Sequence, residues 1–431
     1  MNNIFAGYIY NLGVRLRNPS YSHIYNELKI TEYSSLEQLL DLQNIKLDKL
    51  LRFASEYSPF YKERLKDLMF ESDKLITVSD LKKIPITTKK DLIESNKEIH
   101  TIKNYKFKKL FFSETSGSSG EALTFYKNEK WDSYNRASIA RGMSWYGVNP
   151  WEKNGYLWGY SFNNIRKLKT RFLDFFLNRF RLFSYDDKII GRFLLELRYA
   201  NYLSGYSSMI YECAKFVNAH GNKYNLKLVK GTSEKIYDHY NKESIRAFGN
   251  KIISEYGAAE AGIIAFECPK GGLHINEETC VVEVINDEIL VTNLVSYSFP
   301  VIRYKLGDYV YLSAEKCRCG RSHRLIKDVL GRVGKNIYGR FNNYFPSLTL
   351  YYIFKRMALE HNINLNYTAI QNIKGNLIIK IKEDIGYKVH ALIKQIANDY
   401  FADSVEIDII SGVEIHDHQQ KLKDFTSTIN E

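Results

Sequence analysis

Apolar residues recur at helical spacing through most of the first 110 residues of the chain. The longest run, LEQLLDLQNIKLDKLLRFASEY at residues 36–57, stops at Ser58-Pro59, which is a typical helix boundary. In the later segment IPITTKKDLIES, a proline turn and a threonine N-cap at Thr87 or Thr88 indicate the start of another helix. The pattern therefore predicts a mostly helical region over residues 1–110.

The periodicity then changes to short apolar runs. The segment KKLFFSETSGSSGEALTFYKN (108–128) predicts a strand, a Ser/Thr/Gly loop and a second strand. A helix over 129–147 and a buried strand over 155–162 are expected next. From residue 205, strands and helices alternate through KLVKG, SEKIYDHYNKESIRAFG and NKIISEYG, which predicts a parallel α/β layer. Residues 279–312 then have the pattern of strands alone.

A second unit is predicted from residue 334 onward. Two strand patterns, NLIIKIKED and SVEIDIISGVEI, flank the helical pattern YKVHALIKQIANDYF, which indicates a small α+β domain. We therefore predict an α/β protein with a large N-terminal domain over 1–333 that contains helices, mixed and parallel sheets and a β subdomain. A small mobile C-terminal α+β domain over 334–431 completes the prediction, with the linker after GRVGK.

The composition is that of an ordinary globular protein. Of the 431 residues, 45% are hydrophobic and 26% charged, so the chain can bury a large core and is not disordered. The 25 Gly and 5 Cys exclude the collagen-like and disulfide-scaffold classes. A net charge of +12 favours acidic partners such as nucleotides or anionic lipids. Nucleic acid is not an expected partner, because no recognition motif accompanies the charge.

The N-terminal sequence MNNIFAGYIYNLGVRLRN has an apolar patch but neither a basic start nor a cleavage site. It predicts a helix rather than a signal peptide. No run of about 18 apolar residues occurs, so no transmembrane helix is expected. An odd number of scattered cysteines is typical of a reducing compartment. We therefore expect a cytoplasmic protein, whose oligomeric state the sequence does not define.

One basic, aromatic stretch has two interpretations. The stretch at 166–200, which begins RKLKTRFLDFFLNRFRLF, is typical of an amphipathic helix that packs on the body of a protein with its basic residues in solvent. The same pattern suits a helix that contacts a membrane surface or a partner. The first case is the commoner one, and peripheral membrane contact stays open as the alternative.

A small-residue loop joins the two strands predicted in 108–128. It consists of Thr115, Ser116, Gly117, Ser118, Ser119 and Gly120. Successive small residues let main-chain N–H groups turn inward and form an anion nest, which suits the outer phosphates of a nucleotide. The loop lacks the Gly-Lys-Ser/Thr sequence of the P-loop. Taken alone, such a loop is more often a plain turn.

Two further motifs follow predicted strands. In YGAAE, the Tyr256 ring can stack on a base, and the Glu260 carboxylate can reach a magnesium ion that bridges phosphates. In RYKLGD, Asp308 can accept hydrogen bonds from ribose hydroxyls. The alternatives are a core tyrosine at a strand–turn junction and an ordinary β-turn aspartate.

Four residues form a candidate metal site. CPKGGLH supplies Cys268 and His274, and CRCG supplies Cys317 and Cys319, whose spacing disfavours an internal disulfide. Three thiolates and one imidazole suit tetrahedral Zn²⁺ in a structural role. The alternative is a turn with unmetallated cysteines. The two other cysteines are interpreted as ordinary buried thiols: Cys213 and Cys280.

The order of these motifs, TSGSSGE, YGAAE, RYKLGD and a GR pair at 331–332, resembles that of the adenylate-forming ligases. Within that superfamily, the chain looks like the phenylacetate–CoA ligase branch and its capsular-polysaccharide (CapK-like) relatives. Further matching segments are SEYSPFYKERL, LKKIPITTKKDL, GLHI and GRVGKNIYGRFNNYFPS. The resemblance extends from roughly residue 50 to the C-terminus.

The resemblance implies a role for each candidate position. The small-residue loop would hold phosphates, Asp308 would bind ribose, and Arg332 would lie beside ribose and phosphate. Glu260 would hold Mg²⁺, and Lys421 in QQKLKDF would be the lysine of the mobile domain that reaches the carboxylate and the α-phosphate. The adenine site would comprise Gly231, Thr232, Ser233, Glu234, Tyr256, Gly257 and Ala258. The acyl pocket of relatives falls at Trp158, Tyr160, Tyr206 and Ser207, where core aromatics are an equal alternative.

Some positions depart from the family pattern. Gln420 replaces the glycine usual before the lysine, and Gly334-Lys335 replaces an acidic hinge. Phe341 replaces a glycine of the turn that lines the pantetheine tunnel, and Ala122 replaces a proline of the phosphate loop. The resemblance thus implies an intact adenylation site, and it leaves open whether the reaction continues to CoA.

The sequence therefore predicts an AMP-forming ligase that uses ATP and Mg²⁺ to activate a carboxylic acid. The acyl acceptor would be CoA, or an amine or hydroxyl of a sugar in capsular or surface polysaccharide biosynthesis. The alternative is a non-catalytic member of the superfamily that keeps the nucleotide pocket and acts as a scaffold at a membrane surface.

Overall fold

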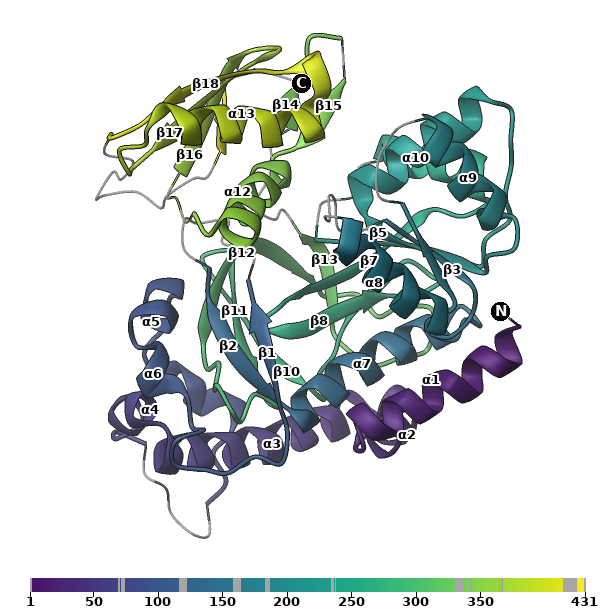
Figure 1. Cartoon of the computed structure of the whole chain (residues 1–431). Coiled ribbons are helices and arrows are strands. Elements are labelled where there is room, and N and C mark those ends of the chain that lie inside the picture. Colours follow the sequence, from purple (N-terminus) through teal and green to yellow (C-terminus); the bar gives the residue numbers. More distant parts are fainter. Residues whose placement is uncertain are drawn as a thin grey trace. The chain divides into compact units, whose positions relative to one another are not determined.

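A computed structural model of the chain shows two compact units (Figure 1). The first comprises Met1–Ser113 and Thr124–Arg332, and the second comprises Glu114–Leu123 and Val333–Glu431. The structure describes residues 2–429 except 69, 71–73, 116–121, 158–163, 183–186, 234–235, 237, 330–335, 342, 364, 366 and 414–424.

Helices occupy most of the N-terminal region, as the sequence predicts. The longest, α3, begins at a capping box in which Ser35 and Gln38 exchange hydrogen bonds. Ser58 ends α3 and caps the next helix, and Pro59 stands at its first position. Thr88, not Thr87, caps α5. The helices are α1 (Asn3–Arg17), α2 (Tyr21–Ile30), α3 (Leu36–Tyr57), α4 (Pro59–Arg64), α5 (Lys89–Glu94) and α6 (Asn96–Ile99), with 3-10 turns at Thr31–Tyr33 and Val78–Lys83.

One mixed sheet forms the centre of the first unit, with eleven strands among the described residues in the order β10-β11-β12-β13-β9-β8-β7-β6-β5-β3-β4. The strands from β4 to β7 are parallel, and all other neighbours are antiparallel. The parallel strands are β3 (Asn154–Leu157), β4 (Arg179–Arg181), β5 (Tyr202–Tyr206), β6 (Leu228–Thr232) and β7 (Ile252–Ala258). The others are β8 (Gly262–Glu267), β9 (Leu273–Ile275), β10 (Cys280–Ile285), β11 (Glu288–Asn293), β12 (Tyr304–Ser313) and β13 (Leu325–Val329).

The predicted parallel layer and the predicted all-β stretch are therefore both present, and they share one sheet. Helices connect the parallel strands: α8 (Asn164–Phe176), α9 (Asp187–Leu197), α10 (Ser207–Ala219) and α11 (Asp238–Phe248). The helix expected over 129–147 is α7 (Glu129–Ser144), which packs against the sheet through a core that includes Met143, Tyr202 and Phe266. The first residues of the strand expected over 155–162 belong to β3, and the rest of that range, 158–162, lies outside the described residues.

The predicted strand–loop–strand segment forms a two-stranded sheet of β1 (Leu110–Glu114) and β2 (Thr124–Asn128). The second unit has its own core between two helices and a four-stranded sheet in the order β18-β17-β16-β19, and it includes Ile353, Ile379 and Ile396. Its elements are β14 (Asn336–Tyr338), β15 (Tyr344–Pro346), α12 (Leu348–His361), β16 (Tyr367–Ile373), β17 (Asn376–Ile381), α13 (Tyr387–Phe401), β18 (Glu406–Ile410) and β19 (Phe425–Ser427).

Candidate active site and metal cluster

The predicted adenine-site residues lie at one edge of the parallel strands. Because β5, β6 and β7 are parallel, their carboxyl ends meet at the same edge, which is where open α/β sheets bind ligands. Tyr206, the last residue of β5, pairs with Thr232, and Thr232 pairs with Glu255. The YGAAE motif follows directly, because Tyr256, Gly257 and Ala258 complete β7.

Two of the three nucleotide motifs touch through their side chains. The Tyr256 hydroxyl donates a hydrogen bond to Asp308 Oδ2 over 2.9 Å. Both residues are partly exposed, so a ligand can approach them. Tyr256 comes from β7 and Asp308 from β12, which are 52 residues apart in the chain. The fold thus brings the residue predicted for adenine next to the residue predicted for ribose.

A second contact joins the same two motifs inside the protein. The Glu260 side chain is buried, and its Oε1 accepts a hydrogen bond of 3.0 Å from the hydroxyl of Tyr304 in RYKLGD. The Glu260 carbonyl accepts another of 3.2 Å from Asn293 Nδ2. Tyr304 itself is pinned by Thr87, since a main-chain bridge joins these two residues. The carboxylate predicted to hold Mg²⁺ is therefore held by Tyr304 of β12, and the main chain of the same residue is held by Asn293 of β11.

The neck of the small-residue loop is held by two hydrogen bonds. The Thr115 N–H donates to the Leu123 carbonyl over 2.9 Å, and the Leu123 N–H donates to Thr115 Oγ1 over 3.0 Å. The loop residues themselves lie outside the described part of the chain: Ser116, Gly117, Ser118, Ser119 and Gly120.

Sequence reasoning missed Lys127, which follows the loop on β2. Its Nζ lies 5.7 Å from the centroid of the Phe125 ring and 5.5 Å from that of Trp131, both at cation–π distance. Burial lowers the pKa of Lys127, against the opposing effect of the Asp132 and Glu260 carboxylates. A single lysine in an aromatic strand has no motif, so only the folded structure indicates its proximity to Glu260.

The close packing around β6 explains why Gly231 stands in the segment predicted to bind adenine. A Cβ on Gly231 would lie 2.5 Å from Ser207 Oγ and 2.8 Å from Ile252 Cγ2, so a larger residue would displace β6 or its neighbours. Ser233, just after β6, has a φ of 67° and turns the chain away from the strand direction. Glu234 lies outside the described residues. One residue earlier, Lys230 forms a buried ion pair with Glu255.

Several predicted residues cannot be placed in the site. Tyr206, the last residue of β5, and Ser207, the first of α10, are buried, while their predicted acyl-pocket companions Trp158 and Tyr160 are outside the described residues. Phe341 is 75% exposed on the second unit. The other residues outside the described part are Arg332, Gly334, Lys335, Gln420 and Lys421.

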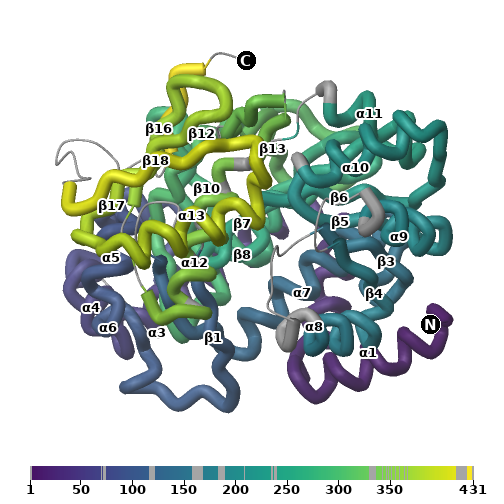
Figure 2. Tube along the Cα trace, turned by 45° about the horizontal axis from the view of Figure 1, so that its top comes forward, coloured from purple at the N-terminus to yellow at the C-terminus, as the bar shows by residue number. Residues whose placement is uncertain are grey.

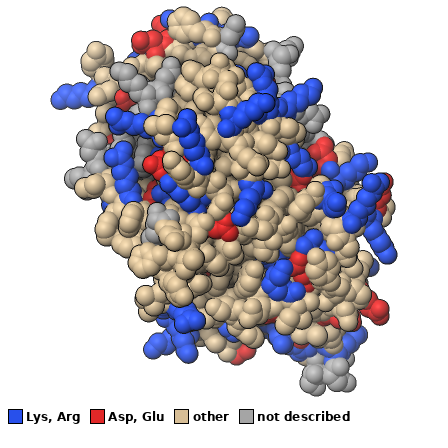
Figure 3. Space-filling model, turned by 90° about the vertical axis from the view of Figure 1, so that its right-hand side faces the viewer, with Lys and Arg blue, Asp and Glu red and all other residues tan. Residues whose placement is uncertain are grey.

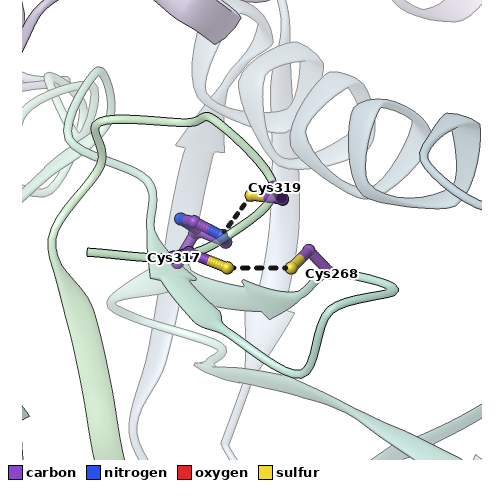
Figure 4. Close-up of side chains that lie close together, drawn as sticks. Cys268, Cys317 and Cys319 are labelled. Carbon is purple, nitrogen blue, oxygen red and sulfur yellow. Dashed lines mark hydrogen bonds between the residues drawn. The ribbon is translucent and has the colours of Figure 1, made fainter. Parts of the chain in front are cut away.

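The four predicted metal ligands converge, and their donor atoms all lie within 4.8 Å of one another. Cys268 follows β8, His274 lies in β9, and Cys317 and Cys319 lie between β12 and β13. The sulfurs of Cys268 and Cys317 are 3.5 Å apart, and Cys319 Sγ lies 3.2 Å from His274 Nε2. Figure 4 shows the three thiols turned toward the same point.

These distances fit a tetrahedral ion. With Zn–S bonds of about 2.3 Å, the ligand atoms of a tetrahedral site stand roughly 3.8 Å apart. The backbone also leaves room for the cluster, because a Cβ on Gly272 would lie 2.7 Å from Cys317 Sγ and 3.2 Å from His274 Nε2. Glycine at this position lets the main chain pass close to the donor atoms.

The protonation of the donors follows from their surroundings. Burial, with His323 close by, lowers the pKa of His274 to about 4, so its imidazole is neutral, as a metal ligand must be. Burial raises the pKa of Cys268 to about 12. Burial also acts to raise the pKa of Cys319, but hydrogen bonds from Arg321 and the other two thiols outweigh it and lower that pKa.

A network of buried charges lies directly under the cluster. Arg141 Nη1 is 2.6 Å from Glu278 Oε1, and His323 Nε2 is 3.0 Å from the same oxygen. The His323 ring lies 6.3 Å from that of His274, at a right angle to it. Sequence reasoning missed this network, because two adjacent glutamates such as Glu277 and Glu278 are typical of a protein surface, and only tertiary contacts bury them. The structure therefore joins the candidate metal site to α7, which carries Arg141.

The fold class is that of acyl-CoA ligases. A solved structure of 2-hydroxyisobutyryl-CoA ligase with its acyl-adenylate and CoA, in the thioesterification state, superimposes with a TM-score of 0.61 at 16% identity, covering 92% of this chain and 91% of that one. The open conformation of the same enzyme gives a TM-score of 0.57 at 14% identity, covering 92% and 93%.

Sequence comparison points to the same group of proteins. The chain is 26% identical to protein CapK of Staphylococcus aureus over 369 residues, which are 83% of this chain and 78% of CapK. It is 28% identical to the phenylacetate–coenzyme A ligase of Thermus thermophilus over 122 residues, 25% of this chain and 27% of that protein. No family model matches the chain. The resemblance to adenylate-forming ligases and the resemblance to CapK are thus both confirmed.

The described helices were also compared with the length and apolar character of a membrane span. None of them has both the length and the hydropathy that crossing a bilayer requires.

Proposed function

We propose that this protein uses ATP to activate a carboxylic acid as its acyl-adenylate. The observation that supports this most directly is the pair of contacts between YGAAE and RYKLGD, from Tyr256 to Asp308 and from Tyr304 to Glu260. They build one polar site at the carboxyl edge of parallel strands, where nucleotides bind in α/β folds. The likeness to 2-hydroxyisobutyryl-CoA ligase supports the same reaction.

The proposed roles follow the types of the side chains. Asp308 accepts hydrogen bonds from the ribose, and the Tyr256 ring lies against adenine. The loop that starts at Thr115 holds phosphates through its main-chain N–H groups. Glu260 is the carboxylate that would hold Mg²⁺, which would neutralise charge on the phosphates when bound.

In the proposed reaction, a carboxylate oxygen of the acid forms a bond to the α-phosphorus of ATP. The bond between the α-phosphorus and the bridging oxygen breaks, and pyrophosphate leaves. Lys421 of the second unit is proposed to stabilise the negative charge that develops on the α-phosphate oxygens, because a lysine acts as a mobile point charge. Arg332 is proposed to bind ribose and phosphate beside Asp308.

The test is exchange of labelled pyrophosphate into ATP with a panel of carboxylic acids. We expect exchange that depends on the acid and is lost in Asp308→Ala and Lys421→Ala. Asp328→Ala is the matched control, because Asp328 is an exposed carboxylate of the same sheet. Full exchange in Asp308→Ala, or ATP binding without exchange for any acid, would contradict the proposal.

The acyl acceptor is proposed to be a sugar amine or hydroxyl in surface-polysaccharide assembly, with CoA as the other candidate. The similarity to CapK supports the first, and the similarity to CoA ligases supports the second. The exposed Phe341 at the position of a glycine in the pantetheine turn disfavours CoA. Since ATP is the cosubstrate, the proposed location is the cytoplasm. Trapping of the acyl group, with CoA or with amino sugars added after adenylation, separates the two acceptors.

We also propose that the Cys/His cluster holds a structural zinc ion. A closed set of four protein ligands has no open position for a substrate, so its role is to fix β8, β9 and the β12–β13 connection. Metal analysis of the purified full-length protein is expected to give one zinc per chain. The double variant Cys317→Ser/Cys319→Ser should lose it, whereas Cys213→Ala should retain it. Equal zinc in all three proteins would contradict the assignment.

The second candidate function is a scaffold at a membrane surface that keeps the fold without catalysis. The departures at Gln420 and Gly334-Lys335 from the family pattern favour it. It predicts binding to anionic vesicles together with no pyrophosphate exchange for any acid, whereas the ligase proposal requires exchange.

A further inference from the structure

Helix α1 presents an apolar face to solvent. Its outward side chains are between 60% and 73% exposed: Ile4, Phe5, Tyr8, Leu12 and Leu16. At 100° per residue, these positions fall within an arc of roughly 120°. The opposite face, with Ala6, Gly7 and Val14, packs into the protein. The helix therefore carries apolar side chains on the face exposed to solvent as well as on the face packed into the protein.

Helix α8 continues this surface. Its side chains Leu168, Phe172, Leu173 and Phe175 are all at least half exposed. Asn178, just after α8, donates from Nδ2 to Asn3 Oδ1 over 3.0 Å, which holds the end of α8 beside the start of α1. Figures 1 and 2 show the two helices side by side from two directions. We call these exposed residues of the two helices the α1–α8 surface.

Cations lie within and beside the α1–α8 surface. Arg15 stands on α1, and Lys109 contacts the carbonyl of Leu16 at the end of that helix. Lys169 and Arg171 are exposed on α8. The acid of the same helix, Asp174, is buried and paired with Arg181. Figure 3 shows Lys and Arg outnumbering Asp and Glu on one side of the molecule, around large uncharged areas.

Exposed apolar side chains interspersed with cations match the chemistry of an anionic lipid surface. Monomeric proteins rarely expose contiguous apolar patches of this kind. A helix with such a face lies in the membrane interface with its apolar side among the acyl chains, while Lys and Arg meet the headgroup phosphates. The net charge of +12 acts in the same direction. We propose that the α1–α8 surface docks this protein on anionic membranes.

The fold separates this surface from the proposed nucleotide site. Asn3 Oδ1 also accepts a hydrogen bond of 3.1 Å from the Lys153 N–H, one residue before β3 begins. The start of α1 therefore lies at the amino ends of the parallel strands, whereas Thr232 and Tyr256 lie at their carboxyl ends. The start of α1 and the end of α8 are thus separated from the carboxyl edge, and the inference rests on exposed residues of these helices, so it does not depend on the proposed function.

The test is sedimentation of the full-length protein with vesicles of phosphatidylcholine alone or with one quarter phosphatidylglycerol. We expect binding to the anionic vesicles that weakens as salt is raised, because headgroup attraction is screened. The triple variant Ile4→Ser/Tyr8→Ser/Leu12→Ser should bind at least about tenfold more weakly, since it removes the inserted apolar groups. Lys169→Glu with Arg15→Glu should weaken binding and reduce its salt dependence.

Matched controls come from exposed residues of the second unit. Ile373→Ser/Tyr387→Ser removes apolar groups that are 69% and 87% exposed, and Lys382→Glu/Lys388→Glu reverses two exposed charges. Both should bind vesicles as the wild type does. Pyrophosphate exchange and far-UV circular dichroism should be unchanged in the α1 variant, which shows that it is folded.

Three outcomes would overturn the proposal. The first is wild-type protein that binds no vesicles at low salt. The second is undiminished binding of the triple variant. The third is a wild-type protein that binds no lipid and is a dimer in light scattering, while the triple variant is a monomer. The α1–α8 surface would then be the contact between two copies of the chain.

Discussion

Arg141→Met removes the cation that faces a fully buried carboxylate. The Arg141 side chain is 1% exposed and that of Glu278 is 0% exposed. Besides the 2.6 Å contact between them, Arg141 Nη2 donates to Asn276 Oδ1 over 2.6 Å. Burial alone would raise the pKa of Glu278, but Arg141 and His323 hold it well below its usual range. The substitution therefore leaves a buried anion with much of its compensation removed.

The expected loss follows from the partners that remain. Breaking a buried ion pair by removing one member costs about 3–5 kcal/mol. Glu278 keeps His323 Nε2 at 3.0 Å and the Thr31 hydroxyl at 2.7 Å, so we expect the lower end, about 3 kcal/mol. Because a folded domain is stable by only about 5–15 kcal/mol, this loss is large but need not abolish folding.

Urea unfolding measured by tryptophan fluorescence reports this loss. All four tryptophans lie between residues 131 and 158, so the signal comes from the first unit. Lys90→Met is the control, because it breaks an exposed pair with Glu94 and should cost less than about 0.5 kcal/mol. The double variant Arg141→Met/Glu278→Gln no longer has an unpaired buried carboxylate. We expect it to recover at least about half of the unfolding free energy that Arg141→Met loses.

Two results would refute the reasoning. One is a loss below about 1 kcal/mol in Arg141→Met, which would mean that water or other groups compensate the anion. The other is a double variant that is no more stable than Arg141→Met alone, because the penalty would then come from packing and not from charge.

The remaining predictions concern the same two regions. Folding lowers the pKa of Glu278, so the ionised carboxylate contributes stability above the usual carboxyl pKa of about 4.3. This stability is lost as the pH falls through the pKa of Glu278 in the folded protein. Acid unfolding monitored by fluorescence should therefore begin at higher pH in Arg141→Met than in the wild type. Gly272→Ala places a methyl group against Cys317 Sγ and should lower the zinc content, measured by metal analysis, with Gly386→Ala, which meets nothing within 4 Å, as control. Lys127→Met removes a cation near Glu260 and should slow pyrophosphate exchange about ten- to a hundredfold, whereas Lys130→Met, on the exposed side of α7, should not.

The pattern of apolar and polar residues predicted several helices and strands whose limits are set by short-range interactions. The helix over 36–57, the strands at either end of 108–128 and the succession β17, α13 and β18 in the second unit all follow from periodicity, caps and turn residues. The predicted metal ligands also came together, since few residue types bind zinc and the chain has only 5 cysteines.

Tertiary contacts decided what the sequence could not predict. The insertion of β13 between β12 and β9 joins β10, β11 and β12 to the rest of the sheet, and no local signal encodes that order. Glu278 and Arg141 look like surface residues in sequence, because their burial depends on segments 137 residues apart. The apolar outer face of α1 was missed for the opposite reason: a helix with two apolar faces looks like an ordinary core helix.

The bridge between Thr87 and Tyr304 has a consequence for chimeric ligases. Thr87 donates its N–H to the Arg303 carbonyl, and its own carbonyl accepts from the Lys305 N–H, so the segment before α5 pairs alongside β12, the strand that carries Asp308. The N-terminal helices and this strand must consequently be exchanged together. A crossover near residue 108 would pair a foreign N-terminal segment with the native strand, whereas one beyond residue 329 would transfer the pairing intact.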